Sequence, residues 1–315
     1  MKKLLKADLH KTKAYLDNHC RQLERARFKY FYANGEKEKV LEELKVYQNS
    51  DGGFGNGIEP DFWTPVSSPM ATWAAGQILF EIDADKNEPM VQQMIDYLIE
   101  HYNRETGKWL SVIPEINDAP HAPWWHWEEG AEENWSFNPS IELAAFLIHW
   151  SEPESIAATI GWDSIKQAVS YLMEQKEMDK HEINNFQAFV TIIESHQSLL
   201  ETETGHSYQI ILNKVEELAF HCINKDTSSW DSGYVPLPLD FIDSPDNPLC
   251  ERLGNLLEKN LDFYIEKMSE EGVWNISWEW GMFPEAFEKA SIYWQGILAV
   301  ERYKKLEAFG RLEFK

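Results

Sequence analysis

Cysteine and long apolar runs are the first things that the chain lacks. Among its 315 residues are three cysteines, Cys20, Cys222 and Cys250, and no two of them form a Cys-x-x-Cys pair. Neither a disulfide framework nor a cysteine zinc site is therefore expected. No apolar run approaches the roughly 18 residues of a transmembrane helix. The basic N-terminus lacks the sustained apolar region of a signal peptide, so a cytoplasmic protein is predicted.

Basic residues are also scarce. The chain carries 29 Lys and Arg against 53 Asp and Glu, a formal net charge of −24. Such a surface repels phosphate backbones and anionic membranes, so no nucleic-acid partner is expected. Evenly spaced strand patterns are hard to find, whereas long helical patterns are frequent. We therefore predict an all-α fold in a single domain over residues 1–315.

The spacing of apolar residues predicts about ten helices joined by several long connections. The clearest helices cover residues 8–33, 36–47, 69–82, 139–150, 162–176, 182–201, 206–224, 248–269 and 284–309. The longest connection, about 104–137, is rich in Trp, Pro, Glu and His. Long ordered loops in a compact domain commonly carry function.

A glycine turn with an embedded aromatic residue recurs along the chain. Its clearest copy is Gln48-Asn-Ser-Asp-Gly-Gly-Phe-Gly, and weaker copies occupy residues 106–110, 229–233 and 271–275. Stacked helical hairpins explain such recurrence, because one hairpin cannot bury its apolar face alone. At roughly 50 residues a unit, about six hairpins fit. We interpret residues 48–55 as a structural clasp between hairpins.

Two of these units resemble the repeats of terpenoid cyclases and protein prenyltransferases. They are the clasp with the alanine-rich helix from Pro69, and Gly272-Val-Trp-Asn followed by Ala290-Ser-Ile-Tyr-Trp. The resemblance implies an α/α toroid of about six hairpins, with a prenyl or terpenoid ligand in its central cavity. It does not carry over the chemistry. The Asp-x-Asp-Asp acid motif of class II cyclases and the zinc ligands of prenyltransferases are missing, so no cofactor or metal is predicted.

The segment from His121 to Glu129 is the first candidate site. It reads His-Ala-Pro-Trp-Trp-His-Trp-Glu-Glu. Glu128 or Glu129 is a candidate acid/base, because a carboxyl group desolvated by indoles has a raised pKa. A ligand platform is predicted from His121, Trp124, Trp125, His126, Trp127 and Trp135. The alternative is a rigid plug whose acids face water. A metal at the two histidines is disfavoured, since no third ligand is evident.

Two further acidic and aromatic sets are candidates. Glu59, Asp61 and Trp63 follow the clasp. The two acids could bind a cation or activate water, or they could accept hydrogen bonds from the backbone of a turn. This loop is expected to lie beside residues 121–137. The second set, in the C-terminal loop, is Trp278, Glu279 and Trp280.

Three functions remain open at this level. The resemblance implies an enzyme on a prenyl or terpenoid substrate. Indole platforms with paired carboxylates also suit glycosidic bonds, so a carbohydrate-active hydrolase or lyase is an alternative. The third is a non-catalytic binding or scaffold protein, since a fold does not decide a function. In the first two, a small molecule in a central cavity is the expected partner; the oligomeric state is not specified by these patterns.

Overall fold

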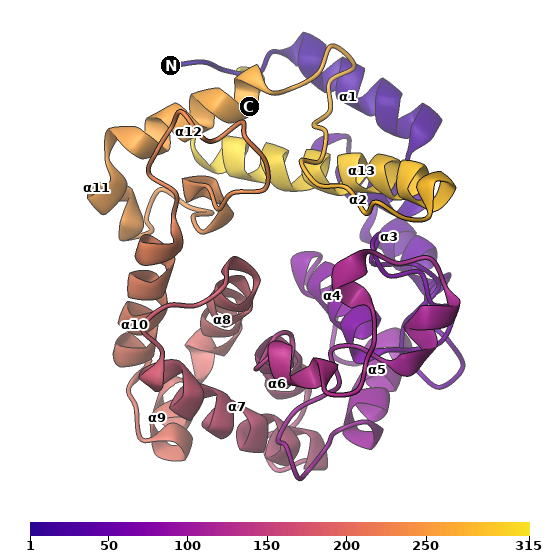
Figure 1. Cartoon of the computed structure of the whole chain (residues 1–315), viewed down its shortest axis with the longest axis vertical. Coiled ribbons are helices and arrows are strands. Elements are labelled where there is room, and N and C mark those ends of the chain that lie inside the picture. Colours follow the sequence, from indigo (N-terminus) through magenta and orange to yellow (C-terminus); the bar gives the residue numbers. More distant parts are fainter. The chain divides into compact units, whose positions relative to one another are not determined.

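The computed structural model describes residues 1–315, and they form an all-α protein (Figure 1). Extended segments pair only as isolated bridges, which confirms the predicted fold class. None of the helices combines the length and the apolar character that crossing a bilayer demands. Two compact units can be distinguished, Met1–Leu44 with Ile223–Lys315, and Lys45–Cys222. Closure of six hairpins into a ring and a single domain stay predictions.

The first unit is built on the longest helix, α13 (Pro284–Ala308), which packs against α1 (Lys6–His19) and α2 (Gln22–Tyr32). Its aromatic core centres on Tyr303, whose ring meets Phe28 and Trp274 edge to face at centroid distances of 5.2 and 5.9 Å. The remaining helices of this unit are α11 (Leu249–Leu253), α12 (Asn255–Glu266) and most of α3 (Lys37–Lys45).

The second unit is a two-layered stack of helical hairpins. Its helices are α4 (Pro69–Glu81), α5 (Pro89–Glu100), α6 (Ser140–Trp150), α7 (Ile156–Glu174), α8 (Lys180–Ile193), α9 (Gln197–Thr204) and α10 (Tyr208–Cys222). Helix α6 contacts α4 and α8 in one layer and α5 and α7 in the other, while α10 lies against α7 and α8. Because α6 has neighbours on so many sides, it is buried along nearly its whole length.

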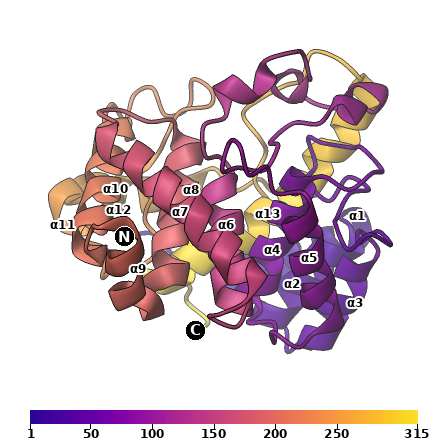
Figure 2. The same cartoon turned by 90° about the horizontal axis from the view of Figure 1, so that it is seen from below.

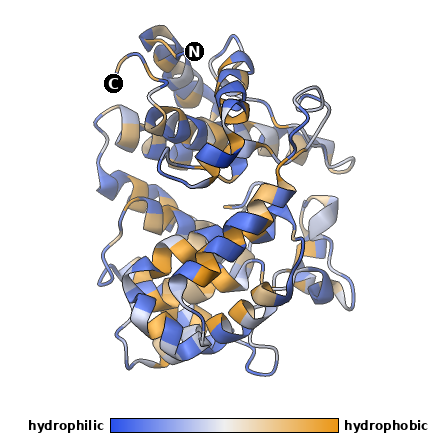
Figure 3. Ribbon diagram, turned by 90° about the vertical axis from the view of Figure 1, so that its left-hand side faces the viewer, coloured by the Kyte–Doolittle hydropathy of each residue, from blue (hydrophilic) through white to orange (hydrophobic).

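Hydropathy follows this packing. Most helices show orange and blue residues in alternation rather than one colour throughout (Figure 3). That pattern is typical of amphipathic helices with one face toward a core. Helix α6 departs from it, since its buried run from Ile141 to Ile148 is apolar at every position except Glu142.

The glycine turns have the structural role predicted from their recurrence. Phe54 is fully buried and pairs with both Gln48 and Ser68. The Gln48 amide donates to the Gly52 carbonyl at 2.9 Å and to the Met90 carbonyl, in α5, at 3.0 Å. The clasp therefore ties the turn to the starts of α4 and α5.

The other copies use an indole in place of this amide. Trp109 donates through Nε1 to the Leu98 carbonyl near the end of α5, at 2.8 Å. In the first unit, Trp274 donates in the same way to Tyr264, near the end of α12, at 2.6 Å. Each indole satisfies a carbonyl that its helix leaves without a partner. The helical-repeat character inferred from the sequence is confirmed by these bonds.

The helix predicted over residues 8–33 was wrong in one respect, because the chain breaks at Cys20. Cys20 and Arg21 are extended, with ψ angles of 167° and 155°. The break lets Arg21 turn back to form a two-pronged ion pair with the fully buried Glu24, at 2.7 and 2.8 Å. The predicted helix over 182–201 is likewise divided, by a 3₁₀ turn at Glu194–His196.

Candidate functional site

Two loops of the second unit come together at the end of the stack where α4 and α6 begin (Figure 2). Phe62 pairs with His121, Trp63 donates its backbone N–H to the Pro120 carbonyl at 3.1 Å, and Ala122 donates to the Asp61 carbonyl at 2.9 Å. This pairing confirms the expectation that the loop after the clasp lies beside residues 121–137.

Aromatic stacking makes the longer loop into an ordered wall. Trp125 lies parallel to Trp135, with centroids 4.6 Å apart and an interplanar angle of 4°, and it meets Phe62 edge to face at 5.5 Å. Trp125 is buried, whereas Trp124 is 44% exposed and Trp127 is half-buried. The tryptophans predicted as one platform thus divide into a packed pair and a solvent-facing remainder.

The five predicted acids have different environments. Glu59 and Asp61 are buried, and Glu59 accepts a hydrogen bond from the Asp61 backbone N–H at 2.7 Å. This bond corresponds to the alternative in which the acids accept hydrogen bonds from the backbone of a turn. Glu128 and Glu129 are exposed, so the burial beside indoles that suggested them as acids is absent. Glu279 is exposed and belongs to the first unit. Among the four acids of the second unit, Glu59 and Asp61 are the pair joined by a hydrogen bond.

The aromatic residues around Glu279 also divide. Trp280 is 2% exposed and packs on Phe287, so it is part of the core. Trp278 is half-buried and makes edge-to-face contacts with Tyr234 and Trp294, both at 5.3 Å.

A carboxyl group that the sequence analysis missed lies in the first turn of α6. Glu142 is 2% exposed, and its Oε2 atom accepts hydrogen bonds from Trp73 Nε1 at 2.6 Å and Gln77 Nε2 at 3.3 Å. Burial raises the pKa of Glu142 to about 8, and the two donors, which favour the charged form, offset this only in part. Burial therefore favours the protonated form of Glu142 at pH values where an exposed glutamate is ionised.

Close approach of two helices makes this contact possible. A Cβ atom on Gly76 of α4 would lie 2.4 Å from the Phe146 ring of α6. Only glycine leaves room for the ring there, so α4 comes near enough for Trp73 and Gln77 to reach the acid. Trp73 is half-buried and Gln77 is exposed, so the pair of donors connects Glu142 with the surface.

Two other acids of this unit have raised pKa values through burial, Glu132 and Glu182. Both use their two oxygens within the protein. Glu182 accepts the Phe137 backbone N–H and the Tyr171 hydroxyl, each at 3.2 Å. Glu142 differs, because its Oε1 atom has no hydrogen-bond partner in the protein. Of the three, Glu142 is the acid with an oxygen that has no hydrogen-bond partner in the protein.

Glu132 anchors the long loop, and its removal gives a testable prediction. Its carboxylate accepts the backbone N–H groups of Ser111 at 3.1 Å and Val112 at 3.0 Å, and both residues are buried. Glu132→Ala leaves these two amides without a partner, at a cost of about 1–3 kcal/mol each. We expect hydrogen exchange at Ser111 and Val112 to accelerate at least tenfold by mass spectrometry or NMR. Glu133→Ala, an exposed neighbour, is the control and is expected to change neither rate.

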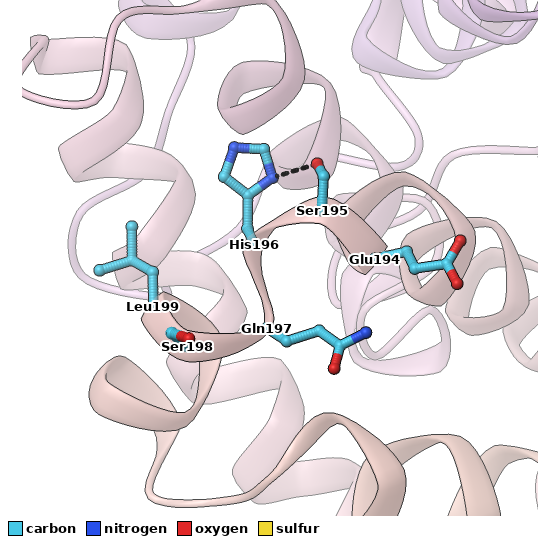
Figure 4. A pocket seen from close by; sticks show the side chains of 6 residues that line it. All are labelled: Glu194, Ser195, His196, Gln197, Ser198 and Leu199. Carbon is cyan, nitrogen blue, oxygen red and sulfur yellow. Dashed lines mark hydrogen bonds between the residues drawn. The ribbon is translucent and has the colours of Figure 1, made fainter.

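A separate pocket of about 410 Å³ is lined by the six consecutive residues 194–199, which form the turn after α8 and the first residues of α9 (Figure 4). Ser195 Oγ lies 2.9 Å from His196 Nδ1, a distance suited to a nucleophile and its base. Glu194 points away from the imidazole, however, so no acid orients it (Figure 4). Ser195 is exposed on a surface turn, and this pocket carries no functional assignment.

Comparisons with known proteins suggest no function, so a function has to be inferred from the geometry of the site. No family model, no curated protein and no solved structure matches the chain. No group of three or more His, Cys, Asp or Glu side chains is placed to hold a metal ion.

Proposed function

We propose that this protein is an acid–base enzyme whose substrate is a neutral, hydroxyl-rich small molecule, with carbohydrates as the chemical class that fits best. The observation that carries the proposal is the Glu142 carboxyl group, held through one oxygen by Trp73 and Gln77 while the other oxygen has no partner. A carboxylic acid that is neutral at pH 7 can serve as a general acid.

The hydrogen bonds also indicate where the acidic proton resides. Oε2 accepts from two N–H donors, so the proton of the neutral acid belongs on Oε1. From there it can be transferred to a substrate oxygen, such as a glycosidic leaving group: the O–H bond to Oε1 breaks, and the carboxylate that remains is stabilised by the same two donors. Trp73 and Gln77 thus orient the acid and stabilise the carboxylate left by proton transfer.

Polarity favours a hydroxyl-rich ligand over a prenyl chain. In the same layer as α4 and α6, helix α8 carries two amide oxygens, of Asn184 and Asn185, that are buried without a hydrogen-bond partner. Ligand hydroxyl groups would satisfy such acceptors, whereas a hydrocarbon chain would leave them unpaired. Half-buried indoles such as Trp73 offer the flat faces on which sugar rings stack.

Charge favours a neutral ligand. The chain has a net charge of −24, and Glu59 and Asp61 are buried at the same end of the stack as Glu142. A prenyl diphosphate would meet this negative field at close range. The prenyl or terpenoid class implied by the resemblance is therefore the alternative that an experiment should exclude.

Glu142→Gln tests the proposal. Saturation-transfer NMR with a panel of neutral disaccharides, and with farnesol and geranyl diphosphate, identifies the ligand class, and product analysis measures turnover. Glutamine keeps the shape but has no acidic proton, so we expect turnover to fall at least 100-fold while binding is largely kept. Glu100→Gln, an exposed acid at the end of α5, is the control. Binding of farnesol or geranyl diphosphate with no saccharide binding would contradict the proposal.

A further inference from the structure

A second chemical group of the same unit is a pair of hydrogen-bonded histidines in the loop 119–127. His121 is 1% exposed, and its Nδ1 atom lies 2.6 Å from the Ala119 carbonyl oxygen. Its Nε2 atom lies 3.1 Å from Nδ1 of His126, which is exposed. The pair therefore runs from a buried backbone carbonyl to the solvent.

The two imidazole rings are joined edge to edge. Their planes differ by 18° and their centroids are 5.4 Å apart. This centroid separation matches the N–N distance with the two ring radii added, so both nitrogens lie close to the line between the centroids. A bond between His121 and His126 is therefore nearly straight and lies in the plane of both rings, which is the favourable geometry for N–H···N. Stacking of ring faces would place the nitrogens off this line.

The position of each proton follows from this chain of contacts. A backbone carbonyl can only accept, so His121 must donate to Ala119 through Nδ1–H. The Nε2 atom of neutral His121 is then an acceptor, and His126 must donate to it through Nδ1–H. This leaves the lone pair of neutral His126 on Nε2, in a side chain that is exposed. Both rings are thereby held as Nδ1–H tautomers.

We propose that Nε2 of His126 is a proton acceptor in the chemistry of this protein, and that His121 is a positioning residue that fixes its tautomer. The assignment of His126 as a base rests on the proposed function, whereas the tautomers do not. In the step, an O–H bond of the substrate or of water breaks, its electron pair stays on oxygen, and an N–H bond forms at Nε2. The resulting imidazolium remains bonded to His121, which in turn remains bonded to Ala119.

A purely structural role would require fewer hydrogen bonds than the two histidines make. One hydrogen bond from His121 to Ala119 is enough to satisfy the buried ring, and an exposed side chain at position 126 needs no partner because water is available. Neighbouring contacts hold the histidine pair in place, because residues 120–122 pair with residues 61–63 and Trp125 stacks on Trp135. An exposed base whose orientation is fixed by a buried partner is a common arrangement for proton transfer.

Imidazole nitrogen NMR tests the tautomers without any substrate. In alkaline solution, where imidazoles are neutral, long-range ¹H–¹⁵N correlations of the labelled full-length chain report which nitrogen is protonated in each ring. We expect Nδ1–H in both His121 and His126. His121→Gln is expected to keep Nδ1–H at His126, because its amide oxygen can accept, whereas His121→Ala is expected to release this restraint. A wild-type Nε2–H signal from either ring would overturn the proposal and leave the role of Glu142 untouched.

Kinetics test the role of the base. On a substrate identified by the saccharide screen, His126→Ala is expected to lower kcat about 100-fold with little change in KM. His121→Gln is expected to retain most of the activity, and His121→Ala to lose about tenfold. An unchanged kcat in His126→Ala would overturn the proposal. So would equal losses in the two His121 variants, since they would show a requirement for packing alone.

Discussion

Replacing Glu142 by glutamine is expected to make the protein more stable than the wild type in alkaline solution. The folded-state pKa of Glu142 is raised to about 8 from an ordinary value of 4.5, because burial penalises the carboxylate. The folded state therefore holds this proton more tightly than the unfolded chain does. The resulting stabilisation is complete below pH 4.5 and is lost as the pH rises through about 8.

The size of the effect follows from the shift. Each pKa unit corresponds to about 1.4 kcal/mol, so the wild type should lose on the order of 4 kcal/mol through Glu142 between acidic and alkaline pH. As the pH rises from acidic to alkaline, the free energy of unfolding of Glu142→Gln minus that of the wild type should therefore increase by this amount. Urea titrations at pH 5, 7 and 9 measure the difference, with hydrogen exchange of the α6 amides as a local probe.

Glu100→Gln provides the matched control, because the same chemical change is made at an exposed acid. Its difference from the wild type should be nearly independent of pH. A pH-independent difference for Glu142→Gln as well would show that Glu142 is ionised in the folded protein. That result would also remove the general acid from the proposed function.

The same proton links stability to the proposed chemistry. Turnover that depends on neutral Glu142 should decline as the pH rises through about 8, where the carboxylate forms. The buried acid would thus destabilise the fold and lose its catalytic proton over the same pH range. Such conflicts between local stability and function are typical of catalytic groups held in apolar surroundings.

The helices and the clasps could be predicted from the sequence because their signals are local. Apolar spacing placed the helix at 69–82 within one residue of the observed α4, and the glycine turn around Phe54 was correctly interpreted as structural. The break at Cys20 could not be predicted in this way. Arg21 forms an ion pair there with Glu24, and the burial of Glu24 comes from packing against Gly296 of α13, a residue distant in the sequence.

The candidate site was predicted less completely, for a related reason. Composition drew attention to the tryptophan-rich loop, but Glu128 and Glu129 of that loop are exposed. Burial of Glu142 depends on how closely α4 approaches α6, which Gly76 and Phe146 determine. One local signal was nevertheless present: Glu142 is the single acid in a run of apolar residues. An isolated acid on an apolar helix is rarely buried without a partner, and here the partners are on α4.

A clasp glycine should be among the least replaceable residues of the second unit. Gly52 has a φ of +91°, and a Cβ atom there would lie 2.2 Å from the backbone carbonyl oxygen of Gln93 in α5. A helix carbonyl cannot rotate away as a side chain can, so α5 or the turn would have to move. Gly52→Ala is therefore expected to combine backbone strain with overpacking, a loss of about 3 kcal/mol in the free energy of unfolding.

Gly130 separates these two contributions. Its φ of +88° is nearly the same as that of Gly52, but a Cβ atom there would meet nothing within 4 Å. Gly130→Ala should therefore cost only the strain, about 1 kcal/mol. Urea titration of both variants checks the difference, and hydrogen exchange of the α5 amides should accelerate only in Gly52→Ala. Backbone strain alone would lower the free energy of unfolding of both variants equally. Equal losses would therefore mean that the clasp does not press against α5. A larger loss in Gly52→Ala is expected because only its Cβ atom meets the Gln93 carbonyl.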